Sequence, residues 1–211
     1  HPRLVSFLRQ TRIKSSIYGS GSYYYQIVKK PKIFNGIPRF YKRYGMPQFL
    51  FKRMLKEIES PDIILVTSGM TYWYKGAFEA IEILKSTFPR TPLVLGGIYA
   101  TLCYEHALKF SGADFVFKGS DLSGILRLVS KILNKKFYLN CAAEYVLPAY
   151  ELYARLEYVS LRTSSGCPYK CSYCGWYLLN SQFSQRGAES VASEVEYFSK
   201  KLRIKNIAFY D

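Results

Sequence analysis

Between residues 61 and 133, short apolar runs alternate with longer amphipathic stretches. Ile63-Ile64-Leu65-Val66 is a continuous apolar run of the kind that fills a parallel strand buried on both faces, and 93–95 and 115–117 repeat it. Helical spacing of apolar residues predicts helices over 77–88, roughly 100–110 and 122–133, the last capped by Ser120 or Asp121. Strands alternating with helices through short connections predict a right-handed, doubly wound parallel sheet of Rossmann type.

A second, shorter alternation follows at the end of the chain. Residues 158–162 read as a strand, a cysteine-bearing loop comes next, and a helix over 189–202 leads to a strand over 206–210. The chain therefore divides into a first segment (1–60), an α/β domain (61–133), a linker (134–156) and the start of a second α/β domain (157–211).

The first segment differs in composition from the rest. Glycine and proline allow only short elements there, apart from a helix near 48–58. Residues 1–60 hold 13 Lys/Arg against two Glu, which accounts for +11 of the net charge of +15. Because these cations lie among tyrosines, the segment could contact nucleic acid. A solvated basic face, or one covered by an acidic part of the protein, are the alternatives.

Composition narrows the class of protein further. Hydrophobic residues make up 49% and charged residues 21%, as in folded globular proteins, and no apolar run reaches the length of a membrane span or resembles a signal peptide. The chain starts at His1 and ends at Asp211 directly after an apolar run, so we expect a piece of a longer protein. An odd number of cysteines favours reduced thiols in a cytoplasmic protein, with Cys103 and Cys141 as small buried residues.

Three of the five cysteines lie within eight residues, as C-x-x-x-C-x-x-C at Cys167, Cys171 and Cys174. Three thiolates on one tight loop can face a common point, and thiolate sulfur is the usual ligand of an iron–sulfur cluster. On a four-iron cluster, three protein ligands leave one iron open to another molecule. A structural zinc site is the alternative, but it needs four ligands, and His1 and His106 lie far away in sequence.

The cysteine loop resembles the fingerprint of the radical S-adenosylmethionine superfamily, which is C-x-x-x-C-x-aromatic-C after the first strand of a (β/α) barrel. Tyr173 stands at the aromatic position. The sequence around the first cysteine, Thr163-Ser164-Ser165-Gly166-Cys167-Pro168, is also typical of the superfamily. The resemblance implies that the three cysteines bind a 4Fe–4S cluster and that S-adenosylmethionine occupies the open iron. Tyr173 would then lie near the adenine, and reductive cleavage would produce a 5′-deoxyadenosyl radical that abstracts hydrogen from substrate.

The preceding domain is similar to the cobalamin-binding class of radical enzymes. Ser68-Gly69 follows one strand and Gly96-Gly97 the next, and paired glycines let a bulky nucleotide tail lie close to the backbone. The resemblance implies Ser68, Gly69, Gly96 and Gly97 as cobalamin-binding residues at the carboxyl ends of the strands. The Asp-x-His-x-x-Gly motif of many cobalamin proteins is absent, and we expect His106 to be structural.

These resemblances imply an enzyme that cleaves S-adenosylmethionine, for methyl transfer or rearrangement of a small-molecule substrate, with flavodoxin or ferredoxin as electron donor. Asp211, at the end of the last strand, would be a site residue or a simple cap. A radical RNA-modifying enzyme is the first alternative, suggested by the basic segment. A non-catalytic module that binds an iron–sulfur cluster or zinc is the second.

Overall fold

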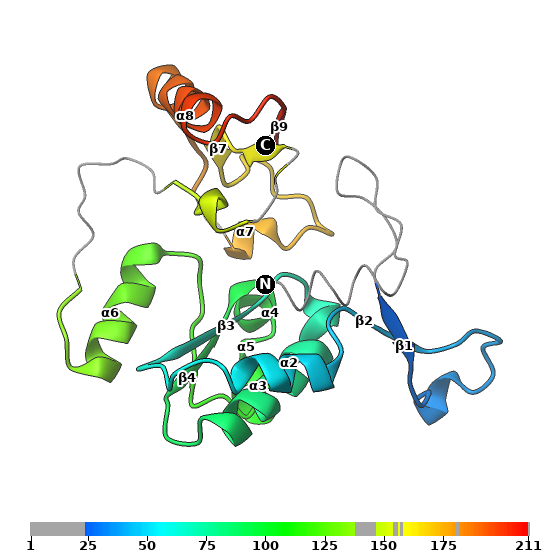
Figure 1. Ribbon diagram of the computed structural model, residues 1–211. Coiled ribbons are helices and arrows are strands. Elements are labelled where there is room, and N and C mark those ends of the chain that lie inside the picture. The colour runs from blue at the N-terminus through cyan, green and yellow to red at the C-terminus, as the bar shows by residue number, and fades with distance from the viewer. Residues whose placement is uncertain (1–23, 138–146, 154–155, 157, 180–181, 211) are drawn as a thin grey trace.

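The computed structural model of the chain describes residues 24–137, 147–153, 156, 158–179 and 182–210. Cys141, Asp211 and the first part of the basic segment lie outside the described residues. Figure 1 shows a larger body built around a parallel sheet, a smaller unit above it that contains the end of the chain, and a hairpin at one side.

The larger body is organised by a three-stranded parallel sheet in the order β3-β4-β5. Its strands are β3 (Ile64–Ser68), β4 (Leu93–Gly96) and β5 (Phe115–Val116). Ile64 pairs with Leu93, and Val94 pairs with Phe115. The protein is therefore a mixed α/β protein with a Rossmann-like sheet, as the alternating pattern predicts.

Helices follow each strand, and most of them pack on one face of the sheet. They are α2 (Gln48–Leu55), η2 (Thr71–Trp73), α3 (Tyr74–Thr87), α4 (Gly97–Leu102), α5 (Tyr104–Phe110) and α6 (Leu122–Leu133). The main core joins Ile64, Leu93 and Leu95 of the sheet to buried residues of α2, α3, α4 and α5. The helix predicted over 100–110 is in fact two short helices, because the chain turns at Cys103.

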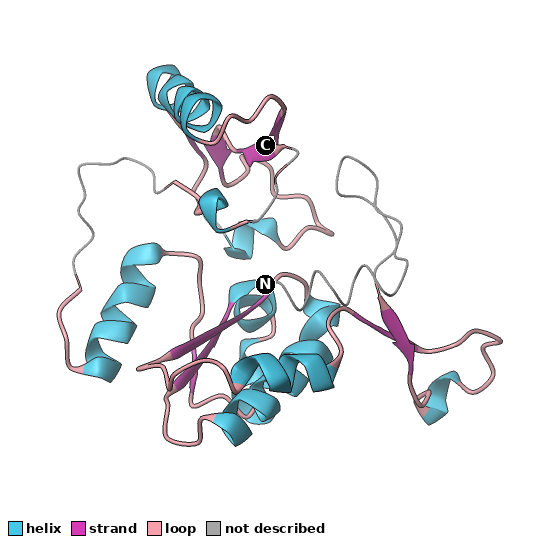
Figure 2. Ribbon diagram, in the orientation of Figure 1, coloured by secondary structure: helices cyan, strands magenta, loops and turns pink. Residues whose placement is uncertain are grey.

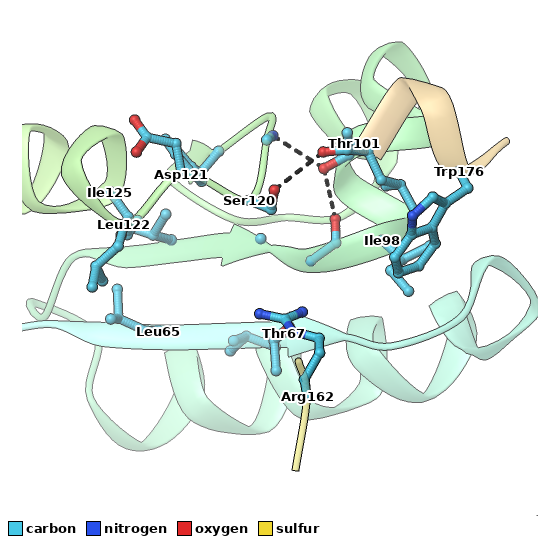
Figure 3. Close-up of a pocket in the computed structure, with 17 residues that line it drawn as sticks. Leu65, Thr67, Ile98, Thr101, Ser120, Asp121, Leu122, Ile125, Arg162 and Trp176 are labelled. Carbon is cyan, nitrogen blue, oxygen red and sulfur yellow. Dashed lines mark hydrogen bonds between the residues drawn. The ribbon is translucent and has the colours of Figure 1, made fainter. Parts of the chain in front are cut away.

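The prediction that the first strand is buried on both faces is wrong for β3. Leu93, Val94 and Leu95 of β4 are buried, but Leu65 of β3 is 58% exposed. Leu65 lies on the face opposite the main core, where it lines a pocket together with Leu122 and Ile125 of α6 (Figure 3). This pocket is described below.

The smaller unit contains a two-stranded parallel sheet of β6 (Val159–Leu161) and β9 (Ile207–Phe209), connected through α8 (Ala188–Lys201). Its core consists of Val159, Phe198 and Ile204. Between β6 and α8 lie β7 (Ser164–Ser165), α7 (Trp176–Leu179) and β8 (Ser184–Gln185), and β7 pairs with β8 in antiparallel fashion. A short helix, η3 (Tyr150–Leu152), precedes the unit. The described residues form a strand–helix–strand unit here and do not form a barrel.

The hairpin consists of β1 (Tyr25–Ile27), η1 (Lys32–Phe34) and β2 (Lys42–Tyr44), with β1 and β2 antiparallel. Figure 2 shows its two strands standing apart from the sheet of the larger body. Among the described residues, no helix has the length and apolar character needed to cross a membrane.

Candidate functional site

An open pocket of about 490 Å³ lies over the free face and the carboxyl ends of the sheet. Its walls come from both units: the strands and the loops after them, the start of α6, and parts of the smaller unit (Figure 3). Leu65, Ile98, Phe117, Leu122 and Ile125 make most of the wall apolar. Carboxyl ends of parallel strands are where α/β proteins bind ligands, so this pocket is the candidate site.

Gly96 and Gly97 line the pocket, and each has a different structural role. Gly97 has φ +91°, and an added Cβ would lie 2.5 Å from Thr67 Oγ1 and 2.7 Å from the Ser68 carbonyl oxygen. Only glycine fits there, because β4 and the end of β3 approach so closely. A Cβ on Gly96 would meet nothing within 4 Å. Gly96 therefore leaves the pocket floor open, and Gly97 holds the strand ends together.

Ser68 and Gly69, which the sequence analysis groups with these glycines, do not line the pocket. Ser68 is buried, and its hydroxyl donates a hydrogen bond of 3.0 Å to the Met70 carbonyl. A Cβ on Gly69 would contact the Trp73 ring at 3.4 Å. In this structure both residues shape the turn after β3.

The loop between β5 and α6 is held by hydroxyl groups. Thr101 donates to the Gly97 carbonyl at 2.9 Å and accepts from the Gly119 N–H at 3.1 Å (Figure 3). Ser120 donates to the Leu179 carbonyl at 3.1 Å, which ties this loop to α7 of the smaller unit. Asp121 accepts from the N–H groups of Ser123 and Gly124, so it is the N-cap of α6 and Ser120 is not.

The cysteine loop runs from Gly166 to Gly175 and is held at both ends. At Gly166, φ is +82°, and an added Cβ would lie 2.1 Å from the Gln182 carbonyl oxygen, so the chain requires glycine directly before Cys167. At the other end, a Cβ on Gly175 would lie 3.5 Å from the Leu102 side chain of α4. The loop therefore adjoins the helix that begins at Gly97.

The three cysteines of this loop are free thiols, and none forms a disulfide. Cys171 is exposed, and Cys167 and Cys174 are half-buried. The Trp176 backbone N–H donates to Cys174 Sγ at 3.4 Å. Among the described residues, no three Cys, His, Asp or Glu side chains converge closely enough to hold a metal ion. The donor chemistry thus fits an iron–sulfur cluster, whereas the three thiols are not gathered around one point here.

Tyr173, the aromatic residue of the motif, is 91% exposed and does not line the pocket. Three other residues of the smaller unit do, Arg162, Trp176 and Leu179, and the sequence analysis assigns none of them. Arg162 follows β6 directly, and Figure 3 shows its guanidinium beside Thr67 at the strand ends. The sequence feature that could have identified Arg162 is its position at the carboxyl end of a strand, directly after the alternating apolar residues Val159 and Leu161.

Arg186 holds two residues shortly before the cysteine loop, Arg162 and Thr163, by hydrogen bonds to their carbonyl groups. Its Nη1 donates to the Arg162 carbonyl at 2.8 Å and to Glu194 Oε2 at 2.5 Å, and its backbone N–H donates to the Thr163 carbonyl at 2.8 Å. The Glu194 side chain is almost completely buried. Through Arg186, the buried ion pair therefore links α8 to Arg162, which lines the pocket.

His106 lies outside the pocket, in agreement with its expected structural role. Its Nδ1 is 2.6 Å from the hydroxyl of Tyr99, which is buried. Burial raises the pKa of Tyr99, and the neighbouring Cys103 and Tyr74 raise it further. Tyr74, Phe78 and Phe110 surround the imidazole. This cluster packs α3 against α5.

Comparison with known proteins finds a distant relative. A protein of Pyrococcus horikoshii, named as an uncharacterized methyltransferase, is 25% identical over 193 aligned residues, which cover 75% of this chain and 41% of the relative. The chain thus corresponds to about two fifths of the relative's length. No family model matches the chain. The chain therefore has distant similarity to a methyltransferase, without assignment to a family.

Proposed function

We propose that this chain is the cofactor-binding part of a methyltransferase of the radical S-adenosylmethionine type, in which Cys167, Cys171 and Cys174 hold a 4Fe–4S cluster. The observation that carries the proposal is the C-x-x-x-C-x-x-C motif on a loop whose three thiols are all free and which adjoins the pocket. The similarity to an uncharacterized methyltransferase supports the reaction class.

In this proposal the chain's own residues bind and shield the cofactors. The Trp176 N–H donates a hydrogen bond to Cys174 Sγ, as donors around cluster sulfurs do. The bound cluster supplies one electron for the cleavage of S-adenosylmethionine, with flavodoxin or ferredoxin as its electron donor. Arg162 and Trp176 bring the cysteine unit over the sheet, where the wall of the pocket is mostly apolar.

The pocket is the proposed seat of the nucleotide tail of cobalamin. Its volume of about 490 Å³ is in the range of small-molecule and cofactor sites, and Gly96 leaves its floor open. Within this proposal residues 61–133 form the cobalamin-binding domain, 134–156 the linker, and 157–211 the beginning of a (β/α) barrel. The parallel pairing of β6 with β9 through α8 supports the last point, because it is the repeating unit of such a barrel.

Anaerobic reconstitution with iron and sulfide tests the cluster. We expect about four iron atoms per chain, a four-iron paramagnetic signal after reduction, and a change of that signal with S-adenosylmethionine. Cys167→Ala should abolish the signal, and Cys103→Ala, which removes a thiol outside the loop, should retain it. Uptake of zinc without iron, or equal signals from both variants, would contradict the proposal and favour a structural metal module.

Cobalamin binding is tested separately by the absorbance of the corrin on the purified chain. Gly96→Val should weaken binding at least tenfold, because its side chain would enter the pocket. Gly76→Val is the matched control, since Gly76 also has no atom within 4 Å of an added Cβ but lies on α3, away from the pocket. Equal affinity of both variants would contradict the assigned seat without affecting the cluster.

A further inference from the structure

The hairpin of residues 25–44, called the basic hairpin below, lies outside the pocket and the cysteine loop. It contains Lys29, Lys30, Lys32, Arg39, Lys42 and Arg43, and no Asp or Glu occurs anywhere between residues 24 and 56. No acidic residue within this segment therefore balances its positive charge. Such a surface attracts anionic partners at physiological ionic strength.

Large apolar side chains stand among these cations. Ile33 is 85% exposed and Phe40 74% exposed, and Ile27, Ile37 and Tyr44 are also exposed. Side chains of this size are normally covered in a folded protein when they gather in one place. The part of the basic hairpin between β1 and β2, which contains Ile33, Ile37 and Phe40, is called the tip below. The tip thus combines apolar residues with lysines and Arg39.

The basic hairpin has its own internal structure. The Val28 N–H donates to the Tyr41 carbonyl at 3.0 Å, and the Lys30 ammonium donates to the Ile37 carbonyl at 2.6 Å. The rings of Phe34 and Tyr41 stack with centroids 6.2 Å apart. These contacts hold the tip in one shape, so the apolar residues are presented on an ordered loop.

Arg43 fastens the base of the basic hairpin to the larger body. Arg43 Nε donates to both carboxylate oxygens of Glu79 on α3, at 2.9 and 2.8 Å, and its Nη1 donates to the Met46 carbonyl at 2.7 Å. Arg43 is thus used for anchoring. Figure 1 shows the hairpin projecting from the larger body.

We propose that the basic hairpin docks this protein on an anionic lipid surface, with Ile33 and Phe40 inserted at the boundary of headgroups and acyl chains. Charge complementarity favours an anionic partner. The isoleucines favour lipid over nucleic acid, because they have no π-face on which a base can stack. A projecting, convex tip also suits a flat bilayer better than it suits single-stranded nucleic acid, which proteins bind along a groove.

The expected binding has two components that can be separated. Lysines near an anionic bilayer strengthen binding in a salt-dependent way. Apolar side chains that enter the boundary region add a component that scales with their buried area and is much less sensitive to salt. Removing the apolar tip should therefore weaken binding even where all cations remain.

Sedimentation of the full chain with phosphatidylcholine vesicles, with and without phosphatidylglycerol, tests the proposal. We expect binding only with phosphatidylglycerol, and a loss of roughly tenfold or more in the double variant Ile33→Ser/Phe40→Ser. Tyr72→Ser/Leu152→Ser is the matched control, because these side chains are similarly exposed and lie elsewhere. Circular dichroism of each variant checks that the fold is retained.

A reporter at the tip distinguishes insertion from other contacts. In Phe40→Trp, anionic vesicles should shift the added indole emission to shorter wavelength, and brominated acyl chains should quench it. The unsubstituted chain, with Trp73 and Trp176, gives the background. The proposal is overturned if anionic vesicles do not bind, if test and control variants lose binding equally, or if RNA oligonucleotides bind at the tip and vesicles do not.

Discussion

The two α/β units of this chain are stabilised in different ways. In the larger unit, eleven buried residues from the sheet and four helices form one continuous core. In the smaller unit the corresponding core has three buried residues, and the buried Arg186–Glu194 ion pair links its helix to the strand that leads to the cysteines. The larger unit is thus held by apolar packing, and the smaller one depends more on directional polar contacts.

This difference corresponds to what each unit presents at the site. The larger unit supplies a fixed floor, the strand ends with Gly96 and Gly97. The smaller unit supplies a loop of ten residues, from Gly166 to Gly175, in which the three cysteines are free thiols and Cys171 is exposed. This loop is fitted closely to its surroundings at Gly166 and Gly175, its two ends.

The largest expected effect tests the polar support of the smaller unit. Glu194→Ala removes a carboxylate whose side chain is 1% exposed and whose Oε2 accepts a hydrogen bond from Arg186 Nη1 at 2.5 Å. We expect a loss of about 3–5 kcal/mol in the free energy of unfolding, the range found when one partner of a buried ion pair is removed. Urea denaturation measures the loss, and hydrogen exchange should show α8 opening before α3.

Glu196→Ala is the control for that substitution. Glu196 lies on the same helix and pairs with Lys200, but both side chains are well exposed, so stability should be unchanged within error. Equal losses from the two substitutions would mean that the buried pair has no special role. The contrast between the units would then rest on their apolar cores alone.

The next largest effect tests the apolar support of the larger unit. Leu95→Ala truncates a side chain of the central strand that is completely buried in the main core. We expect a loss of about 2–5 kcal/mol in the free energy of unfolding, from lost burial and the cavity left behind. Leu65→Ala on β3 should have a much smaller effect on stability, because Leu65 faces the pocket. Thermal denaturation of both variants distinguishes them.

A smaller effect separates the two glycines of the pocket floor. Gly97→Ala would place a methyl group 2.5 Å from Thr67 Oγ1 at φ +91°, so we expect a loss of about 1–3 kcal/mol in stability. Gly96→Ala should fold normally, because nothing lies within 4 Å of the added atom. If both were tolerated equally, the close approach of β4 to the end of β3 would not require glycine.

The order of strands and helices could be predicted from the sequence, because it follows from the local spacing of apolar residues along the chain. The strands at 64–68 and 93–96, the helix capped by Asp121 and the helix over 188–201 all follow their apolar patterns closely. The antiparallel pairing of β7 with β8 could not be predicted, because two-residue strands have no period. The break at Cys103 depends on tertiary packing in the same way.

For the candidate site, sequence identified chemical types but not their neighbours. Gly96 and Gly97 were singled out from their position after a strand, and the structure distinguishes them, because only Gly97 lies against the end of β3 whereas the space beside Gly96 is open. Arg162 and Trp176 were missed, because their place in the pocket wall depends on how the smaller unit packs on α4. The roles of the three cysteines, Tyr173 and the cobalamin seat stay predictions, which the reconstitution and binding experiments test.

The smallest effect concerns an ion pair at the edge of the larger unit and depends on pH. Asp114 accepts hydrogen bonds from Lys85 and, at 2.9 Å, from the Leu93 N–H, which fastens the start of β4 to the start of β5. Burial alone would raise the pKa of Asp114. The bonds from Lys85 and Leu93, together with the charge of Lys85, outweigh burial and hold the pKa below its ordinary value.

A lowered pKa in the folded state means that ionised Asp114 stabilises the fold above the pKa of the unfolded chain. This contribution is lost as the pH falls through the lower, folded-state value. Asp114→Asn should therefore reduce stability by about 1 kcal/mol at neutral pH, and the difference from the unsubstituted chain should shrink below about pH 4. Asp62→Asn, which affects an exposed pair with Lys135, should show no such dependence. Parallel pH-dependent denaturation curves for all three proteins would mean that the Lys85–Asp114 pair does not support the sheet, leaving apolar packing as the main support of the larger unit.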